Sequence, residues 1–290
     1  MLITDEYLEL QEKYVKVYGN DTIVLMQVGS FYECYAVDNE IERTNSDRIH
    51  KIADILNIQK TKKDKKKAVI NRSNPFMIGV PIWSIDKYIQ MLLNANYTAV
   101  IVEQVTEPPD CKRKVTNIHS PGTTLDYTNN SVTNNLMSIY IESVKDQIFI
   151  GNSVIDVSTG VNTIYETYSV KNNNDKIYPL DETYRFIKTY DPREIIIIYD
   201  ATGDTDATDV AKNNSSNNSS NNSSNNSSIL NENYLITYLE LSNKAVHFID
   251  KKDRPEYSNI NYQTKFLEKI FKNQSSLSVI EYLDLERHSL

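Results

Sequence analysis

An aromatic ring and a carboxylate stand two residues apart, directly after a glycine turn, in this chain of 290 residues. Phe31 and Glu33 follow Gly29 and Ser30, which end an apolar run at residues 23–28. On an extended backbone alternate side chains share a face, so Phe31 and Glu33 point the same way. An aromatic ring can enter a base step and unstack it for about a few kcal/mol, least where the pair is already mismatched. The pattern therefore predicts a DNA probe, with a buried strand-end aromatic beside a solvated carboxylate as the alternative.

A run of basic residues is the second feature with nucleic-acid chemistry. It contains seven cations and one anion, Asp64, and so carries a net charge of +6. The cations are Lys60, Lys62, Lys63, Lys65, Lys66, Lys67 and Arg72. Such a run can neutralise several phosphates and gives affinity that depends on salt and ignores sequence. The alternative is a solvated loop that binds nothing.

Charge is distributed unevenly along the chain. Residues 1–125 carry 16 Lys and Arg against 16 Asp and Glu; because the whole chain carries 31 and 39, residues 126–290 carry 15 and 23 and a net charge of −8. Only the first part is electrostatically suited to DNA.

Other chemistries find little support. Cys34 and Cys111 have no metal-ligand spacing and form no disulfide framework, which indicates a reducing compartment. No secretory signal or membrane-length apolar run occurs, so we expect a soluble, intracellular protein (cytoplasm, nucleus or viral factory) that is not secreted. No Gly-x-x-x-x-Gly-Lys-Ser/Thr motif occurs either, so we predict no ATPase activity for this chain. We also predict no catalytic residue, metal site or cofactor in it.

The periodicity of apolar residues predicts two α/β domains. In the first we expect a helix from a Thr4 cap to Gly19, further helices at 47–56 and 84–93, and strands at 23–28, 76–80, 98–105 and 113–123. In the second we expect an antiparallel meander of three strands at 136–142, 147–156 and 162–168. A helix at 181–190, strands at 194–199 and 234–241, and a helix at 264–271 should follow.

A series of short segments, in a fixed order, resembles the MutS family of DNA mismatch repair proteins. The first, at 26–33, resembles the family's Phe-x-Glu mismatch-reading motif, and the others lie at 76–81 with Tyr88, 102–105, 113–115, 120–124, 156–160 and 280–286. The resemblance implies a mixed-sheet mismatch-recognition domain at 1–124, a linker at 125–135 and a ribonuclease-H-like connector at 136–260. A disordered Asn/Ser insertion at 213–228 would interrupt the connector, and 261–290 would begin the lever and core region.

The resemblance also implies a function. The protein would bind mismatched or looped-out bases in duplex DNA, with Phe31 wedging beside the lesion and Glu33 contacting the base. The family works as an ATP-dependent homodimer that uses ATP and Mg²⁺ in a later part of its chain and meets MutL-like partners. The family commonly has Asp where this chain has Ser30, and the Gly-Ser-Phe-Tyr-Glu variant resembles homologues from large DNA viruses.

Two other functions compete with mismatch recognition. A ribonuclease-H-like metal nuclease would use Asp156, on a strand followed by Ser-Thr-Gly. A turn-capping role suits this residue better, because such nuclease sites need several converging carboxylates. A non-specific DNA-binding or partner-docking module would bind matched and mismatched duplexes alike.

Overall fold

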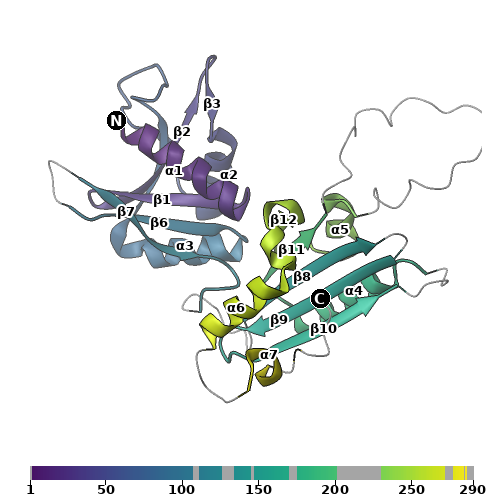
Figure 1. Cartoon of the computed structure of the whole chain (residues 1–290). Coiled ribbons are helices and arrows are strands. Elements are labelled where there is room, and N and C mark those ends of the chain that lie inside the picture. The colour runs from purple at the N-terminus through teal and green to yellow at the C-terminus, as the bar shows by residue number, and fades with distance from the viewer. Residues whose placement is uncertain are drawn as a thin grey trace, which may run out of the picture. The chain divides into compact units, whose positions relative to one another are not determined.

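The computed structural model describes residues 2–106, 111–125, 134–144, 147–169, 175–200, 230–271, 277–283 and 285. The chain forms two compact units, Met1–Asn134 and Asn135–Leu290 (Figure 1). The division falls at the end of the predicted linker. The Asn/Ser tract at 213–228 lies outside the described residues, and none of the described helices is long and apolar enough to cross a membrane.

The first unit is built on one mixed sheet. Its elements are α1 (Ile3–Tyr18), β1 (Thr22–Val28), β2 (Phe31–Asp38), β3 (Arg43–Thr44), α2 (Ser46–Leu56), β4 (Thr61–Lys62), β5 (Phe76–Pro81), η1 (Ile82–Ser84), α3 (Ile85–Asn94), β6 (Thr98–Gln104) and β7 (Arg113–His119). The strand order is β4-β5-β2-β1-β6-β7, with β3 paired to β2. Strands β1 and β6 run parallel, and the other neighbours run antiparallel. The predicted α/β mixed sheet is confirmed.

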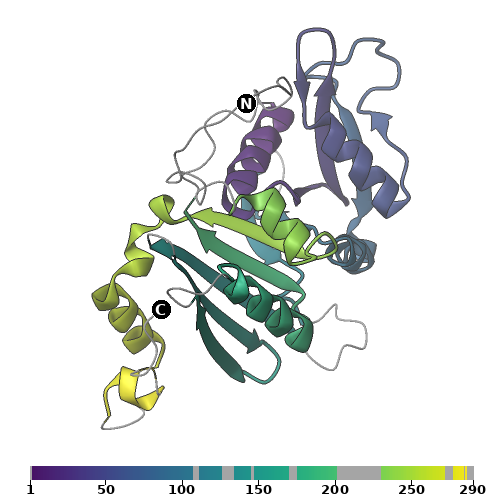
Figure 2. The ribbon, with the colours of Figure 1, turned by 90° about the vertical axis from the view of Figure 1, so that its right-hand side faces the viewer.

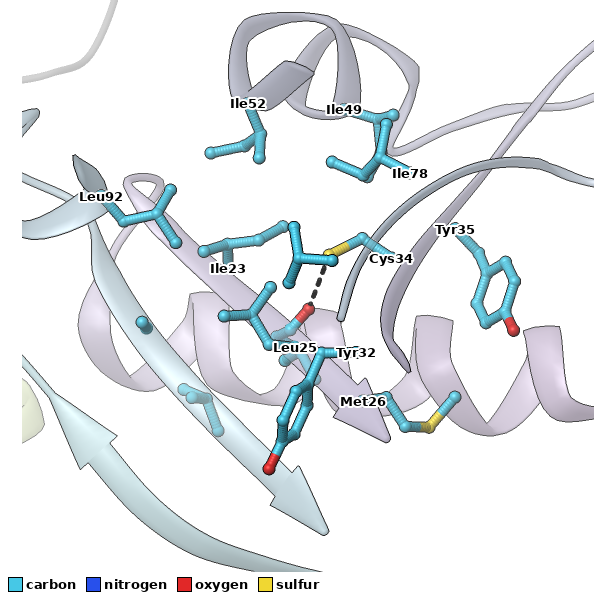
Figure 3. Close-up of a cluster of buried hydrophobic side chains, with 14 of the residues drawn as sticks. Ile23, Leu25, Met26, Tyr32, Cys34, Tyr35, Ile49, Ile52, Ile78 and Leu92 are labelled. Atoms are coloured by element: carbon cyan, nitrogen blue, oxygen red, sulfur yellow. Dashed lines mark hydrogen bonds between the residues drawn. The ribbon is translucent and has the colours of Figure 1, made fainter. Parts of the chain in front are cut away.

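Helices cover both faces of this sheet. Figure 3 shows Ile49 and Ile52 of α2 on one side of the central strands and Tyr35 of β2 on the other side, beside α1. Residues 23–26 of β1 are each no more than 1% exposed. A strand with both faces covered becomes a continuous apolar run, which explains the sequence at this point.

The first helix begins earlier than its sequence suggests. Thr4, predicted as the cap, lies inside α1, which follows Leu2, and its buried hydroxyl has no hydrogen-bond partner among the described residues. The prediction was wrong because the helix begins at Ile3, so the cap position is Leu2, two residues before the polar side chain that could have capped it. The stop was predicted correctly, since Gly19 adopts φ 90° and its N–H donates to the Val15 carbonyl at 2.9 Å.

Gln11 of α1 replaces a strand neighbour of β1. Strand β2 pairs with β1 only from Phe31 to Glu33 and then diverges. Beyond that point the Val24 N–H donates to Gln11 Oε1 at 3.0 Å, and Gln11 Nε2 donates to the Thr22 carbonyl at 2.8 Å. The buried amide thus supplies the hydrogen bonds that β1 would otherwise lose, and it fastens α1 to the strand that leads into the Phe31 turn.

The second unit has a five-stranded sheet. Its first elements are β8 (Asn135–Val144), β9 (Gln147–Asp156), β10 (Asn162–Tyr168), α4 (Tyr178–Tyr190), β11 (Glu194–Tyr199), α5 (Glu232–Tyr238) and β12 (Ala245–Asp250). The order is β10-β9-β8-β11-β12, with an antiparallel meander followed by two parallel pairings. Helices α4 and α5 lie on the same face of this sheet (Figure 2). The predicted order of three strands, a helix and a strand is confirmed.

One element of the second unit was predicted wrongly. Residues 234–241 were expected to form a strand, but they contain most of α5, and the strand is β12. Leu235 and Leu239, one helical turn apart, are both buried, and the Asn231 side chain caps the helix by accepting from the Tyr234 N–H at 2.8 Å. Aromatic and β-branched residues favour strands locally, but burial at a spacing of four selects a helix here.

Short helices follow β12 in the described residues. They are η2 (Lys251–Asp253), η3 (Pro255–Ser258), α6 (Ile260–Ile270) and α7 (Val279–Tyr282). The helix predicted at 264–271 corresponds to α6. A capping box between Ser278 and Glu281 begins α7.

Candidate nucleic-acid interface

The turn between β1 and β2 is a two-residue hairpin loop. Val28 pairs with Phe31 across it, and Gly29 adopts φ 59°, the left-handed conformation that glycine accepts at the first position of such a loop. An added Cβ at Gly29 would meet nothing within 4 Å, so the backbone and not space requires the glycine. Gln27 braces the turn, since its Nε2 donates to the Gly29 carbonyl at 3.3 Å and its Oε1 accepts from the Gln104 N–H at 3.0 Å.

The side chains after the turn alternate as predicted. Phe31 is 43% exposed, Tyr32 is buried and Glu33 is half-buried. On the opposite face the Tyr32 hydroxyl donates to Glu103 Oε1 at 3.3 Å, which fixes the strand that presents Phe31. The alternative of a buried Phe31 is therefore wrong, and Phe31 and Glu33 share one face at the tip of an anchored hairpin.

The Glu33 carboxylate is held by a tyrosine that sequence analysis missed. The Tyr35 hydroxyl donates to Glu33 Oε2, while Oε1 receives no hydrogen bond within the described part of the chain. Tyr35 is fully buried and packs edge-on against Tyr7 with 5.4 Å between ring centres. Gly79 of β5 faces Glu33, and a Cβ there would lie 3.6 Å from the Glu33 Cγ. The ammonium of Lys63 lies 5.6 Å from the centre of the Tyr35 ring. A positively charged residue therefore stands over the tyrosine that holds Glu33.

The basic run lies on the sheet edge beyond β5. Lys62 pairs with Phe76, which in turn pairs with Ala36 of β2. Ala36 is five positions beyond Phe31, so at about 3.4 Å per residue Lys62 is displaced by roughly 17 Å from Phe31 along the strand direction. Phosphates of one strand are spaced about 3.4 Å along a duplex axis, so this separation corresponds to about five phosphates.

Two lysines of the run point their ammonium groups at protein atoms. Lys60 Nζ lies 2.5 Å from His50 Nε2 and 4.2 Å from the centre of the Phe76 ring, and partial burial lowers the pKa of the Lys60 amine. Lys62 Nζ donates to the Ala68 carbonyl at 3.0 Å. Each ammonium thus has a hydrogen-bond partner within the protein, and phosphate contacts by Lys60 and Lys62 remain predictions.

The remaining lysines of the run are exposed. Lys65 and Lys66 make no ion pair with any described residue, and Lys67 lies 3.9 Å from Asp64, which is too long for a strong pair. With Lys63 they form the lysine loop, defined here as Lys63, Lys65, Lys66 and Lys67.

Buried Asn74 organises the backbone of this loop. Its Oδ1 accepts from the Asp64 N–H at 2.7 Å, and its Nδ2 donates to the Val69 carbonyl at 3.0 Å. The Lys63 N–H donates to the Pro75 carbonyl at 3.0 Å. The lysines thus extend from a loop that is fastened from within.

Arg72 has another role. Its guanidinium pairs with Glu42 at 2.8 Å and with Asp5 of α1 at 3.0 Å. These carboxylates raise the pKa of Arg72, and the arginine lowers the pKa of Glu42. The ion pairs join three segments of the first unit and argue against the predicted phosphate contact, which remains a prediction.

Asp156 caps a turn. Its Oδ1 accepts from the Ser158 N–H at 3.0 Å, and its Oδ2 accepts from the Thr159 hydroxyl at 2.9 Å. Among the described residues no group of three His, Cys, Asp or Glu side chains could hold a metal ion. These contacts favour the turn-capping interpretation over the nuclease.

Sequence analysis also missed Gln27, Asn74 and Trp83. Trp83 is 79% exposed beside the hairpin. Its position two residues after Pro81, in the segment that follows a strand, was a signal that could have been used. The support from Gln27 and Asn74 arises from contacts with residues distant in sequence, which no local pattern reveals.

Comparison with known proteins gives concordant matches. The family model of MutS domain I matches residues 4–128. A putative DNA mismatch repair protein of Acanthamoeba polyphaga mimivirus, described as a mutS homologue, is 27% identical over 98% of this chain and 25% of its own length. The DNA mismatch repair protein MutS of Thermodesulfovibrio yellowstonii is 33% identical over 66% of this chain and 19% of its own length. The DNA mismatch repair protein MutS of Streptococcus agalactiae is 25% identical over 95% of this chain and 30% of its own length. The chain thus spans less than a third of each of these relatives.

Proposed function

Because the chain belongs to the MutS family of DNA mismatch repair proteins, we propose that its first unit recognises mispaired or looped-out bases in duplex DNA. The observation that carries this proposal is the placement of Phe31 and Glu33. An exposed ring and a half-buried carboxylate share one face at the tip of a hairpin whose turn and opposite face are both anchored. This arrangement can insert a wedge without reorganising the protein.

Phe31 is the proposed wedge. Inserting its ring into a base step costs about a few kcal/mol of unstacking, and this cost is lowest where pairing is already lost. Stacking of the ring on a base returns roughly 1–3 kcal/mol. The balance favours insertion at a mismatch and disfavours it in an intact duplex, which is the physical source of the proposed preference.

Glu33 is the proposed base contact. Tyr35 occupies Oε2, so Oε1 is the oxygen available to a displaced base. In an intact, stacked duplex Phe31 does not insert and Oε1 meets no displaced base, and a buried acceptor that is left unpaired costs about 1–3 kcal/mol. Glu33 therefore penalises ordinary pairs and adds to the discrimination that Phe31 provides.

The lysine loop supplies the affinity that does not depend on sequence. The loop follows Lys62, whose position in the sheet register lies five residues beyond Phe31, so its four cations can contact phosphates away from the base step that Phe31 enters. If each neutralises one phosphate, the slope of log K against log salt is about −3.6. This attraction offsets the repulsion between Glu33 and the DNA backbone.

The remaining family properties are proposals about a longer protein. ATP and Mg²⁺, a homodimer and a MutL-like partner are implied by the resemblance, and we assign none of them a residue in this chain. No step of the proposed recognition mechanism requires them.

A binding titration tests the proposal. Fluorescence anisotropy would compare matched, G·T and single-base-insertion duplexes with the wild-type chain and Phe31→Ala. We expect tighter binding to the lesions and a loss of this preference, about 5- to 100-fold, in Phe31→Ala.

The matched control is Ile41→Ala, which removes a 97% exposed apolar side chain beyond the other end of β2 and should leave the preference intact. Equal binding of all duplexes by the wild-type chain, falling only with salt, would instead support a non-specific or partner-docking module.

A further inference from the structure

Trp83 stands beside the proposed wedge and is largely uncovered. It is the only tryptophan in the chain, it is 79% exposed, and its ring pairs with no aromatic ring in the part of the chain that the structure describes. A single exposed apolar residue needs no explanation by itself. Its position relative to Phe31 indicates that the exposed ring can contact the same ligand.

The backbone places Trp83 at the level of the hairpin turn. Phe31 pairs with Pro81 of β5, and the Ile82 N–H donates to the Ser30 carbonyl at 3.1 Å, which extends this ladder by one residue. Trp83 follows immediately. The exposed Phe31, at the start of β2, and the exposed Trp83, in η1 directly after β5, therefore occupy the same end of the sheet.

The segment that carries Trp83 is fixed. Pro81 holds φ −65° before η1, and the Ser84 hydroxyl donates to the Pro81 carbonyl at 3.1 Å. The indole is thus presented by a short, braced turn, which limits the entropy that its ordering on a ligand would cost.

We propose that Trp83 is a second DNA-contacting side chain, packing its indole against the sugar-phosphate backbone beside the base step that Phe31 enters. This inference rests on the proposed function. Indole offers a large apolar face and one N–H donor, which suits a deoxyribose and an adjacent phosphate oxygen. The backbone is present in every duplex, so Trp83 positions DNA without distinguishing matched from mismatched pairs.

Local charge separates this contact from that of the lysine loop. The nearest charged residues along the chain, Asp86 and Lys87, have opposite signs. The Trp83 contact should therefore depend on salt much less than the lysine contacts do.

The single tryptophan permits a direct test, because all indole emission from this chain comes from Trp83. The experiment titrates the full chain with matched and G·T duplexes while anisotropy of labelled DNA and tryptophan emission are followed together. We expect emission to change with the same midpoint as anisotropy on both duplexes, and acrylamide quenching to fall when DNA is bound.

Variants complete the test. Trp83→Ala should weaken both duplexes alike by about 5- to 30-fold with an unchanged salt slope, and Trp83→Phe should retain most of the affinity. The matched control is Ile41→Trp in the Trp83→Phe background, whose relocated indole should not respond to DNA. The urea midpoint of each variant verifies folding, which an exposed position should preserve.

The outcomes distinguish this inference from the proposed function. Equal emission changes on both duplexes without mismatch preference would support the Trp83 contact and reject mismatch recognition. Mismatch preference with unchanged emission and unchanged Trp83→Ala affinity would reject the Trp83 contact alone. Absence of DNA binding by anisotropy would reject both.

Discussion

The Tyr35 hydroxyl donates a hydrogen bond to the carboxylate of Glu33, two residues earlier on the same strand. Tyr35 is fully buried, whereas Glu33 is half-buried and shares its face with the exposed Phe31. The donor is locked by the core, so it orients the carboxylate before any ligand arrives. A preorganised acceptor loses less conformational entropy on binding than a free glutamate would.

Tyr35→Phe should therefore weaken lesion discrimination. Loss of the hydroxyl frees the Glu33 rotamers, and we expect the ratio of mismatch to matched affinity to fall several-fold while matched binding changes little. The measurement is the anisotropy titration with G·T and matched duplexes. Tyr7→Phe is the control, because it removes a neighbouring buried hydroxyl that bonds Gln11 and not Glu33. Equal effects of the two variants would contradict the role of Tyr35.

Alkaline pH should destabilise the first unit. Burial, followed by the nearby Glu103 carboxylate, raises the pKa of Tyr32 to about 12. In the unfolded chain this hydroxyl ionises near pH 10, so its contribution to stability is present below about pH 10 and is lost between about pH 10 and 12. Burial raises the pKa of Tyr7 and Tyr35 as well, and they act in the same direction.

Urea titrations between pH 8 and 11.5 measure this effect. The free energy of unfolding should decline above pH 10, and Tyr32→Phe should reduce the slope. A stability that stays level or rises over this range would contradict the assignment.

Gln11→Ala should be strongly destabilising. It leaves the Val24 N–H and the Thr22 carbonyl without their side-chain partner in a buried place, and we expect a loss of about 2–4 kcal/mol. Urea denaturation measures the loss, and hydrogen exchange of the Val24 amide should accelerate in parallel. Exposed Gln59→Ala is the control and should change stability by less than about 0.5 kcal/mol.

Substitutions in the lysine loop should change the salt dependence of DNA binding, whereas substitution of Arg72 should change the stability of the fold. Lys65→Gln with Lys66→Gln should reduce the magnitude of the salt slope by about 1.8, because each lost phosphate contact removes about 0.9. Arg72→Gln should leave the slope unchanged and lower the free energy of unfolding by about 0.5–1 kcal/mol through the lost, partly exposed ion pairs. A reduced slope of log K against log salt in Arg72→Gln would show that Arg72 contacts DNA phosphate.

Asp156→Asn separates recognition from a nuclease. The turn bonds with Ser158 and Thr159 predict a stability loss of about 1 kcal/mol and no change in DNA affinity. The checks are a urea titration and a DNA cleavage assay with Mg²⁺. Metal-dependent cleavage that disappears in Asp156→Asn would favour the nuclease.

Much of the fold could be predicted from local patterns. Backbone geometry over a few residues decides three of the correct predictions, and sequence specifies such geometry directly. These are the turn at Gly29, the alternation of Phe31 with Glu33 and the end of the first helix at Gly19. The strand predicted at 234–241 was wrong because β-branched and aromatic residues are compatible with either structure until the partner surface is known.

Local sequence was sufficient to place an aromatic and a carboxylate on one face after a glycine turn, because the alternation of side chains on an extended strand is a local property. Tertiary structure decided which of those groups are available. It placed Tyr35 on Glu33, Glu42 and Asp5 on Arg72, and Asn74 beneath the lysine loop. The Arg72 ion pairs join segments that only the packed fold brings together, and the Tyr35–Glu33 bond is fixed because the core buries Tyr35. Hydrogen bonds and ion pairs depend on distances in space and not on separation along the chain.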